Sequence, residues 1–175
     1  AVVEFNEKTG DNKLAVAVYR YSTASWLEDQ DFWRLYGIFR DVYLYAIPKV
    51  HVQDLFVKGD YDYQTKAGQL DIDLKTVGDY EDKKIKYVLS DHEGIVTEGD
   101  ASVNGDGELS VSLENLKIKP WSAESPKLYN LTLHVLDDDQ VVEVVPVKVG
   151  FRHFEIKDTL MLLNGKRIVF KGVNR

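Results

Sequence analysis

The segment GQLDIDLKTVG, residues 68–78, restricts the fold of this chain more than any other stretch. Its side chains alternate along an extended strand, with Leu70, Ile72 and Leu74 on one face and Asp71, Asp73 and Lys75 on the other. This two-residue period is typical of an antiparallel strand that buries one face and exposes the other to water. The apolar face must then be covered by a second layer of strands.

Similar strand patterns recur between residues 50 and 150, separated by polar turns at 92–94, 104–107 and 137–139. We count seven strands there, at intervals of about 8 to 15 residues, which suits two packed antiparallel sheets. The predicted fold class is therefore all-β, with an immunoglobulin-like or fibronectin-like β-sandwich at its centre. The hydroxyl of Tyr129 is expected to fix a corner of this sandwich. The chain has no cysteine, so the disulfide that often joins the sheets of such a domain cannot form.

Strand patterns continue on both sides of this region. Lys13–Tyr21 and Asp41–Pro48 each read as a strand that precedes the sandwich. After it, Asn164-Gly165 lies between two apolar runs, and Asn-Gly is a strong hairpin signal because both turn positions need a positive φ. We therefore predict strands before the sandwich and a hairpin after it.

Composition narrows the class of partner. The 175 residues carry a formal net charge of −7, which argues against nucleic acid because phosphate binding requires a basic face. No apolar stretch approaches the roughly 20 residues needed to span a bilayer, so we expect no membrane partner. The absence of cysteine excludes thiolate metal sites, and we expect a cytoplasmic protein. None of the histidines has the spacing of a metal motif: His51, His92, His134 and His153.

Residues 26–44, WLEDQDFWRLYGIFRDVYL, combine acids and aromatics unusually densely. Ser25 and Glu28 have the spacing of a helix capping box, and Trp26 and Trp33 would share one face of a short helix whose acids face water. An irregular loop over a sheet is at least as plausible, because a strand pattern resumes within a few residues. Local sequence alone thus favours a surface element without a ligand.

Three segments, in this order along the chain, closely resemble the large β-galactosidases of glycoside hydrolase family 2. Residues 25–44, SWLEDQDFWRLYGIFRDVYL, are similar to a segment near the end of that family's sugar-binding jelly-roll domain. Residues 120–133, PWSAESPKLYNLTL, resemble a motif of its immunoglobulin-like domain. VGFRHFEI and LLNGKRIVFKGVNR resemble the passage into its catalytic (β/α)₈ barrel. One departure is Tyr36, where the family usually has Ser, and this change would alter the wall of the sugar pocket.

The resemblance, which covers essentially the whole chain, implies three parts. Residues 1–49 would be the C-terminal part of the jelly-roll domain, 50–150 the immunoglobulin-like sandwich, and 151–175 the linker and first hairpin before the barrel. The chain would then be a non-catalytic fragment of a β-galactosidase, which hydrolyses terminal, non-reducing β-D-galactose residues of β-galactosides such as lactose with retention. The family's catalytic glutamates lie beyond Arg175, so we expect no catalytic residue here and no turnover by the fragment alone. The parent is expected to be an oligomer that uses sodium and magnesium, whereas the fragment is expected to hold neither.

The same resemblance implies one site residue, Asp31, the second Asp of the Asp-Gln-Asp run. In the family this carboxylate contacts the 6-hydroxyl end of the galactosyl group and helps to hold a sodium ion. A carboxylate oxygen suits both a hard cation and a sugar hydroxyl. Glu28 and Asp29 are adjacent on one segment, so they would not flank a sugar ring as the two carboxylates of a retaining glycosidase do. On local sequence alone, Asp31 caps or solvates a loop.

Two other interpretations stay open. A β-glucuronidase or β-mannosidase parent would share the architecture, although the Asp-Gln-Asp-aromatic-Trp-Arg run favours a galactosidase. A free-standing carbohydrate-binding or adhesion module would also suit an acidic all-β chain.

Overall fold

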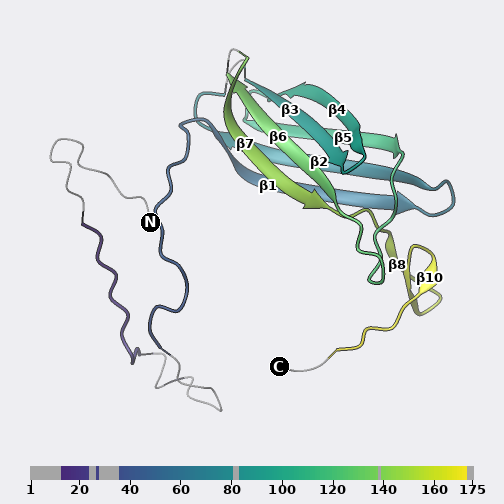
Figure 1. The fold of residues 1–175 in the computed structure, drawn as a ribbon, viewed down its shortest axis with the longest axis horizontal. Helices are drawn as coiled ribbons and strands as arrows, with labels where there is room; N and C mark the ends of the chain where they lie inside the picture. The colour runs from purple at the N-terminus through teal and green to yellow at the C-terminus, as the bar shows by residue number, and fades with distance from the viewer. Residues whose placement is uncertain (1–12, 24–26, 28–35, 81–82, 138, 173–175) are drawn as a thin grey trace. The chain divides into compact units, whose positions relative to one another are not determined.

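The structure is a computed structural model that describes residues 13–23, 27, 36–80, 83–137 and 139–172. The chain divides into two units, Ala1–Tyr45 and Ala46–Arg175. All ten strands of the described residues lie in the second unit (Figure 1). None of the described residues belongs to a helix that is long and apolar enough to cross a membrane.

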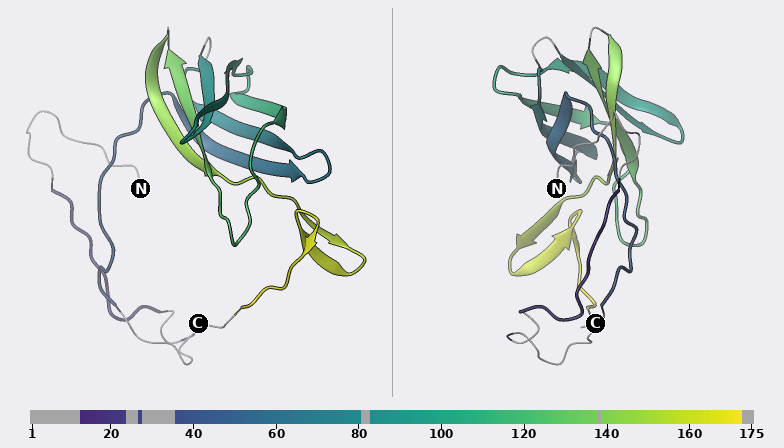
Figure 2. Two further views of the ribbon diagram at one scale, coloured as in Figure 1. Left: turned by 45° about the vertical axis from the view of Figure 1, so that its right-hand side comes forward. Right: turned by 90° about the vertical axis from the view of Figure 1, so that its left-hand side faces the viewer.

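Seven strands form two antiparallel sheets around one hydrophobic core (Figures 1 and 2). The first sheet has the order β1-β2-β5 and the second has the order β4-β3-β6-β7. Their bounds are β1 (His51–Asp62), β2 (Ala67–Val77), β3 (Lys84–Asp91), β4 (Gly94–Ser102), β5 (Glu108–Leu116), β6 (Tyr129–Asp137) and β7 (Gln140–Val149). The predicted all-β sandwich, with seven strands between residues 50 and 150, is confirmed.

Strand β2 shows why this sequence forms a sandwich. Its apolar residues Leu70, Ile72 and Leu74 are buried, as the alternation predicts. Asp71 accepts a hydrogen bond of 2.6 Å from the Ser112 hydroxyl, and Asp73 accepts one of 2.6 Å from the Ser110 hydroxyl. Full burial of a Leu or Ile side chain contributes about 1.5–3 kcal/mol, so the alternation decides which face of the strand turns inward.

Strand β6 supplies the matching surface of the second sheet. Three alternating side chains of this strand are fully buried: Leu131, Leu133 and Val135. Tyr129 begins the strand, and its ring meets that of Phe151 edge-on with 5.4 Å between the centroids. The backbone N–H of Lys119 donates to the Tyr129 hydroxyl over 2.7 Å. The corner predicted for this hydroxyl is therefore confirmed.

Strand β1 contacts the second sheet at both of its ends. Its register with β2 shifts between Val52 and Asp54, which marks a β-bulge. The Val52 amide at this bulge donates to a carboxylate oxygen of Glu143 in β7 over 2.7 Å. Near the other end, a Cβ atom added to Gly59 would lie 2.9 Å from the carbonyl oxygen of Gly150. Only glycine permits this approach of the two backbones without displacement.

A small third sheet of order β10-β9-β8 follows the sandwich. Its strands are β8 (Phe154–Lys157), β9 (Leu160–Leu163) and β10 (Lys166–Arg167). Asn164 and Gly165 form the two-residue turn between β9 and β10, with φ values of 51° and 74°. The predicted Asn-Gly hairpin is confirmed.

The prediction of two strands before the sandwich is wrong. The described residues of 13–21 and 41–48 belong to no strand, and Leu14, Val16 and Val18 are about half exposed. Their alternation is that of a strand, but a strand persists only where a neighbour pairs with its backbone and covers its apolar face. No described segment pairs with either stretch.

Candidate functional site

The residue predicted to bind the sugar, Asp31, lies outside the described residues, as do all of residues 28–35. Tyr36, the departure from the family pattern, is described. The guanidinium carbon of Arg20 lies 4.6 Å from the centre of its ring. Gly37 follows with a φ of 109°, a conformation that residues with a Cβ rarely adopt. The backbone therefore bends at Gly37, and Arg20 covers the Tyr36 ring.

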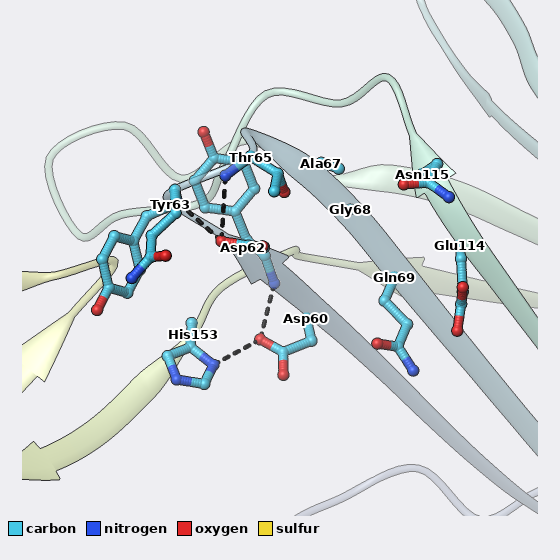
Figure 3. A pocket seen from close by; sticks show the side chains of 12 residues that line it. Asp60, Asp62, Tyr63, Thr65, Ala67, Gly68, Gln69, Glu114, Asn115 and His153 are labelled. Atoms are coloured by element: carbon cyan, nitrogen blue, oxygen red, sulfur yellow. Dashed lines mark hydrogen bonds and ion pairs between the residues drawn. The ribbon is translucent and has the colours of Figure 1, made fainter.

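A polar pocket lies at the tip of the β1–β2 hairpin (Figure 3), with a volume of about 550 Å³. Its walls come from β1, β2 and the end of β5, and His153 joins them from the segment before β8. Carboxylate, amide and imidazole groups line it, and each of these groups can form hydrogen bonds. The partners of these groups decide what the pocket can do.

The side chains of His153 and Asp60 are in hydrogen-bond contact on one side of the pocket (Figure 3). Nδ1 of His153 lies 2.9 Å from Oδ1 of Asp60, and the same oxygen accepts the backbone N–H of Tyr61 over 2.7 Å. The Asp60 carboxylate is thus held by its own strand and fixes the imidazole of a residue 93 positions later. This contact attaches the segment before β8 to the first sheet.

Asp62 closes the turn that forms the rim of the pocket. Its Oδ1 accepts the backbone N–H groups of Gln64 and Thr65 at 2.7 and 3.2 Å. The Thr65 hydroxyl and these two amides lower the pKa of Asp62 below its ordinary value of 3.8, because they stabilise the charged form. The carboxylate is therefore ionised at neutral pH and engaged in an Asx-type turn.

Tyr63 connects the same turn to the third sheet. Its hydroxyl donates to Oε1 of Glu155 in β8 over 2.9 Å. This hydrogen bond to a carboxylate raises the pKa of Tyr63 above 10.0, since loss of the proton would place two negative charges together. The Tyr63 ring also lies over Gly165, where a Cβ atom would come within 2.8 Å of two ring carbons.

These contacts assign a structural role to the acids that line the β1 side of the pocket. Asp60 holds a histidine and Asp62 holds a turn, so both carboxylates have structural hydrogen-bond partners. Within the described residues, no group of three or more His, Asp or Glu side chains could hold a metal ion. The pocket is the junction between the sandwich and the third sheet.

A second charged cluster joins the β3–β4 turn to the segment before β6. Nζ of Lys127 lies 2.6 Å from Oδ2 of Asp91 and 5.0 Å from the centre of the Tyr129 ring. The hydrogen bond from Lys127 lowers the pKa of Asp91, and the bond to Asp91 raises the pKa of Lys127. Only 18% of the Lys127 side chain and 10% of the Asp91 side chain are exposed. The pair therefore closes this end of the sandwich.

The sequence motifs located the Asn-Gly hairpin and the Tyr129 corner but not the pocket. His153 has no metal-type spacing with any acid, and its partner Asp60 is found only when the fold brings β1 to the segment before β8. The same holds for Tyr63 and Glu155, which are 92 positions apart. No local signal in one sequence reports such pairs.

Comparisons with known proteins agree with this architecture. The sequence pattern of glycosyl hydrolases family 2 matches residues 50–152, and the pattern of the sugar binding domain of that family matches residues 2–48. The first of these spans the sandwich described above, and the second spans most of the first unit.

Two curated relatives are each named beta-galactosidase. One from Streptococcus thermophilus is 97% identical over 166 residues, covering 95% of this chain and 16% of that protein. One from Clostridium acetobutylicum is 50% identical over 171 residues, covering 96% of this chain and 19% of that protein. The chain therefore spans less than a fifth of the length of these relatives.

Solved structures with a similar fold include two bacterial β-glucuronidases. That of Parabacteroides merdae has a TM-score of 0.62 at 24% identity, covering 73% of this chain and 17% of that chain. That of Bifidobacterium dentium has a TM-score of 0.61 at 20% identity, covering 71% of this chain and 22% of that chain. At these identities the likeness concerns the fold alone. With the family pattern matched across the whole sandwich, this chain belongs to glycosyl hydrolases family 2.

Proposed function

We propose that this chain is part of a β-galactosidase, an enzyme that hydrolyses terminal, non-reducing β-D-galactose residues of β-galactosides such as lactose. The single observation that carries the proposal is the 97% identity, over 95% of this chain, to the Streptococcus thermophilus beta-galactosidase. The β-glucuronidase structures share the fold at 20–24% identity, so they do not favour the glucuronidase alternative. A free-standing binding module has no observation in its favour.

In this proposal the chain contributes the sandwich fold and one side chain that binds sugar and sodium, and the reaction takes place elsewhere in the parent. Hydrolysis with retention requires one carboxylic acid that protonates the leaving oxygen and one carboxylate that forms a covalent glycosyl intermediate. Of the carboxylates in the described pocket, Asp62 is engaged in a turn and Asp60 in the attachment of the segment before β8. The sandwich would then hold the sugar-binding unit and the residues after 150 in register with the catalytic part.

Asp31 is proposed to bind the 6-hydroxyl end of the galactosyl group and a sodium ion in the parent. The support is the matched Asp-Gln-Asp motif and the chemistry of the donor, a hard oxygen ligand suited to a hard cation. Asp31 lies outside the described residues, and the described residues offer no metal cluster of their own. In the full-length protein, Asp31→Asn should lower kcat/KM for a nitrophenyl β-galactoside at least tenfold, the effect of losing about 1.4 kcal/mol of charge-assisted contact. Near-normal kcat/KM would remove Asp31 from the sugar site.

The activity itself is tested by comparing substrates and chain lengths. The full-length protein should hydrolyse nitrophenyl β-D-galactoside and leave nitrophenyl β-D-glucuronide untouched, whereas the 175-residue chain should hydrolyse neither. A full-length protein that prefers the glucuronide would overturn the proposal. Turnover of the galactoside by the 175-residue chain would show that a catalytic group lies within it.

Further properties of the parent follow from the same proposal. We propose an oligomer in the cytoplasm that uses sodium and magnesium. Sedimentation velocity of the full-length protein tests the oligomer. Its activity after exhaustive dialysis against a chelator in sodium-free buffer tests the use of the two ions, and fractionation of the producing cells tests the location.

A further inference from the structure

Asn164 joins its own turn to two other segments of the second unit, 11 and 43 positions earlier in the sequence. Its backbone N–H donates to the carbonyl oxygen of His153 over 2.8 Å. Its side-chain Oδ1 accepts the backbone N–H of His153 over 2.9 Å. Its side-chain Nδ2 donates to the carbonyl oxygen of Trp121 over 3.0 Å. One turn residue therefore contacts both the segment before β8 and the segment before β6.

The pair of bonds to His153 extends the β8–β9 ladder by one position. The ladder ends at the pair Phe154 and Leu163, so His153 and Asn164 would be the next pair. A positive φ of 51° turns the Asn164 backbone into the hairpin, and its side-chain oxygen accepts the N–H that a strand carbonyl would otherwise accept. The local turn conformation and this side-chain bond thus depend on each other.

The bond to Trp121 connects the hairpin to the core of the sandwich. The backbone N–H of Trp121 donates to the carbonyl oxygen of Phe151 over 2.8 Å, and Phe151 is fully buried. The Arg152 guanidinium carbon lies 5.0 Å from the centre of the Trp121 ring. The β9–β10 turn is therefore two hydrogen bonds away from a core residue.

A second contact holds the same turn through Tyr63. The Tyr63 ring lies over Gly165, and its hydroxyl binds Glu155 on the neighbouring strand of the third sheet. His153 lies beside this ring, with 6.2 Å between the two centroids. The turn is thus anchored through the Asn164 amide and through the Tyr63 ring.

We propose that Asn164 is a positioning residue that locks the third sheet onto the sandwich, so that the chain leaves the sandwich in one fixed direction. We call its three hydrogen bonds the Asn164 latch. In a β-galactosidase parent, this latch sets where the residues after the third sheet meet the catalytic part. This role rests on the function proposed above. Catalysis is sensitive to such placement, because an error of about 1 Å far from the chemistry can cost a hundredfold in rate.

Three substitutions distinguish the loss of the Asn164 side-chain hydrogen bonds from a change in the conformation of the turn. Asn164→Gly keeps a turn that accepts positive φ, because Gly-Gly also forms such hairpins, but it removes both side-chain bonds. Asn164→Asp keeps the acceptor for His153 and replaces the donor to Trp121 with an oxygen. Asp158→Gly is the matched control. It alters the other turn of the same sheet, where the φ of Asp158 is 48°, a conformation that glycine also accepts.

The latch itself is tested on the 175-residue chain by amide exchange and by residual dipolar couplings. The His153 amide should exchange about tenfold faster in Asn164→Gly, the effect of one lost hydrogen bond, and should keep wild-type protection in Asn164→Asp and Asp158→Gly. The dipolar couplings of residues 154–167 should fit the alignment of the sandwich in the wild type and in Asp158→Gly, and depart from it in both Asn164 variants. Wild-type exchange and a single alignment in Asn164→Gly would overturn the latch.

The effect of the latch on catalysis is tested by measuring the kcat of the full-length protein for nitrophenyl β-D-galactoside. The assay temperature is well below the thermal midpoint of every variant. Both Asn164 variants should lose about tenfold or more in kcat, while Asp158→Gly keeps wild-type kcat. A residue that only stabilises the fold would lower the thermal midpoint and leave kcat unchanged, and that result would overturn the positioning role. An inactive wild-type protein would refute the proposed function instead, and exchange and dipolar couplings would still decide on the latch.

Discussion

The hydroxyl of Tyr129 offers a measurable test of the sandwich corner. Tyr129→Phe removes one oxygen from a side chain that is 2% exposed and leaves the ring against Phe151 in place. The lost group accepts the Lys119 N–H over 2.7 Å, so the variant leaves a partly buried amide without its acceptor. An unsatisfied buried donor costs about 1–3 kcal/mol, and we expect the free energy of unfolding to fall by about that amount.

The assay is equilibrium unfolding of the 175-residue chain in urea, followed by circular dichroism. With a slope of about 2 kcal/mol per molar urea, a loss of about 2 kcal/mol lowers the midpoint by about 1 M. Tyr80→Phe is the matched control, because its hydroxyl donates to the Gly105 carbonyl at 3.2 Å in an exposed position. It should change stability by less than about 0.5 kcal/mol. Equal, small shifts in the two variants would show that the corner hydrogen bond does not stabilise the fold.

Three further changes test the packing and electrostatics of the sandwich by the same unfolding assay. Gly59→Ala places a methyl group 2.9 Å from a backbone carbonyl oxygen and should cost about 1–3 kcal/mol, whereas Gly105→Ala, with no described atom within 4 Å of its added Cβ, should be near neutral. Leu131→Ala empties a fully buried position of β6 and should cost about 2–5 kcal/mol; a smaller loss would mean that the core collapses around the gap. The folded pKa of Asp91 is lowered from 3.8 by its bond to Lys127, so its contribution is present above pH 3.8 and is lost as the pH falls through the lowered value. The stability difference between wild type and Asp91→Asn should therefore be constant near neutral pH and shrink on acidification, and a difference independent of pH down to pH 2 would contradict this assignment.

Features encoded within one strand or one turn could be predicted from sequence. The alternation of Leu70, Ile72 and Leu74 with charged residues identified the buried face of β2. A period of two residues indicates a strand and also determines which side chains share its buried face. The Asn164-Gly165 turn was predictable because few other dipeptides accept positive φ at both positions. The prediction failed at residues 13–21, whose pattern is that of a strand but whose partner is not among the described segments.

Features that depend on distant partners could not be predicted. The pocket at the β1–β2 tip exists because Asp60 meets His153 and Tyr63 meets Glu155, and each pair is more than 90 positions apart. Family resemblance supplied Asp31, which local sequence alone would have assigned to a solvated loop. Local patterns specified the strands, whereas the junction between the sandwich and the third sheet arises only from the assembled fold.

The corner and the latch act on the same short piece of backbone. Lys119 donates to the Tyr129 hydroxyl, Trp121 donates to the carbonyl of the buried Phe151, and the Trp121 carbonyl accepts the Asn164 amide. Residues 119–121 are thus held from the core on one side and from the third sheet on the other. Because the two contacts act on one three-residue segment, we expect Tyr129→Phe and Asn164→Gly to have non-additive effects on the free energy of unfolding, although Tyr129 and Asn164 bind different residues of it. Additive losses in the double variant would show that the corner and the latch stabilise the fold independently.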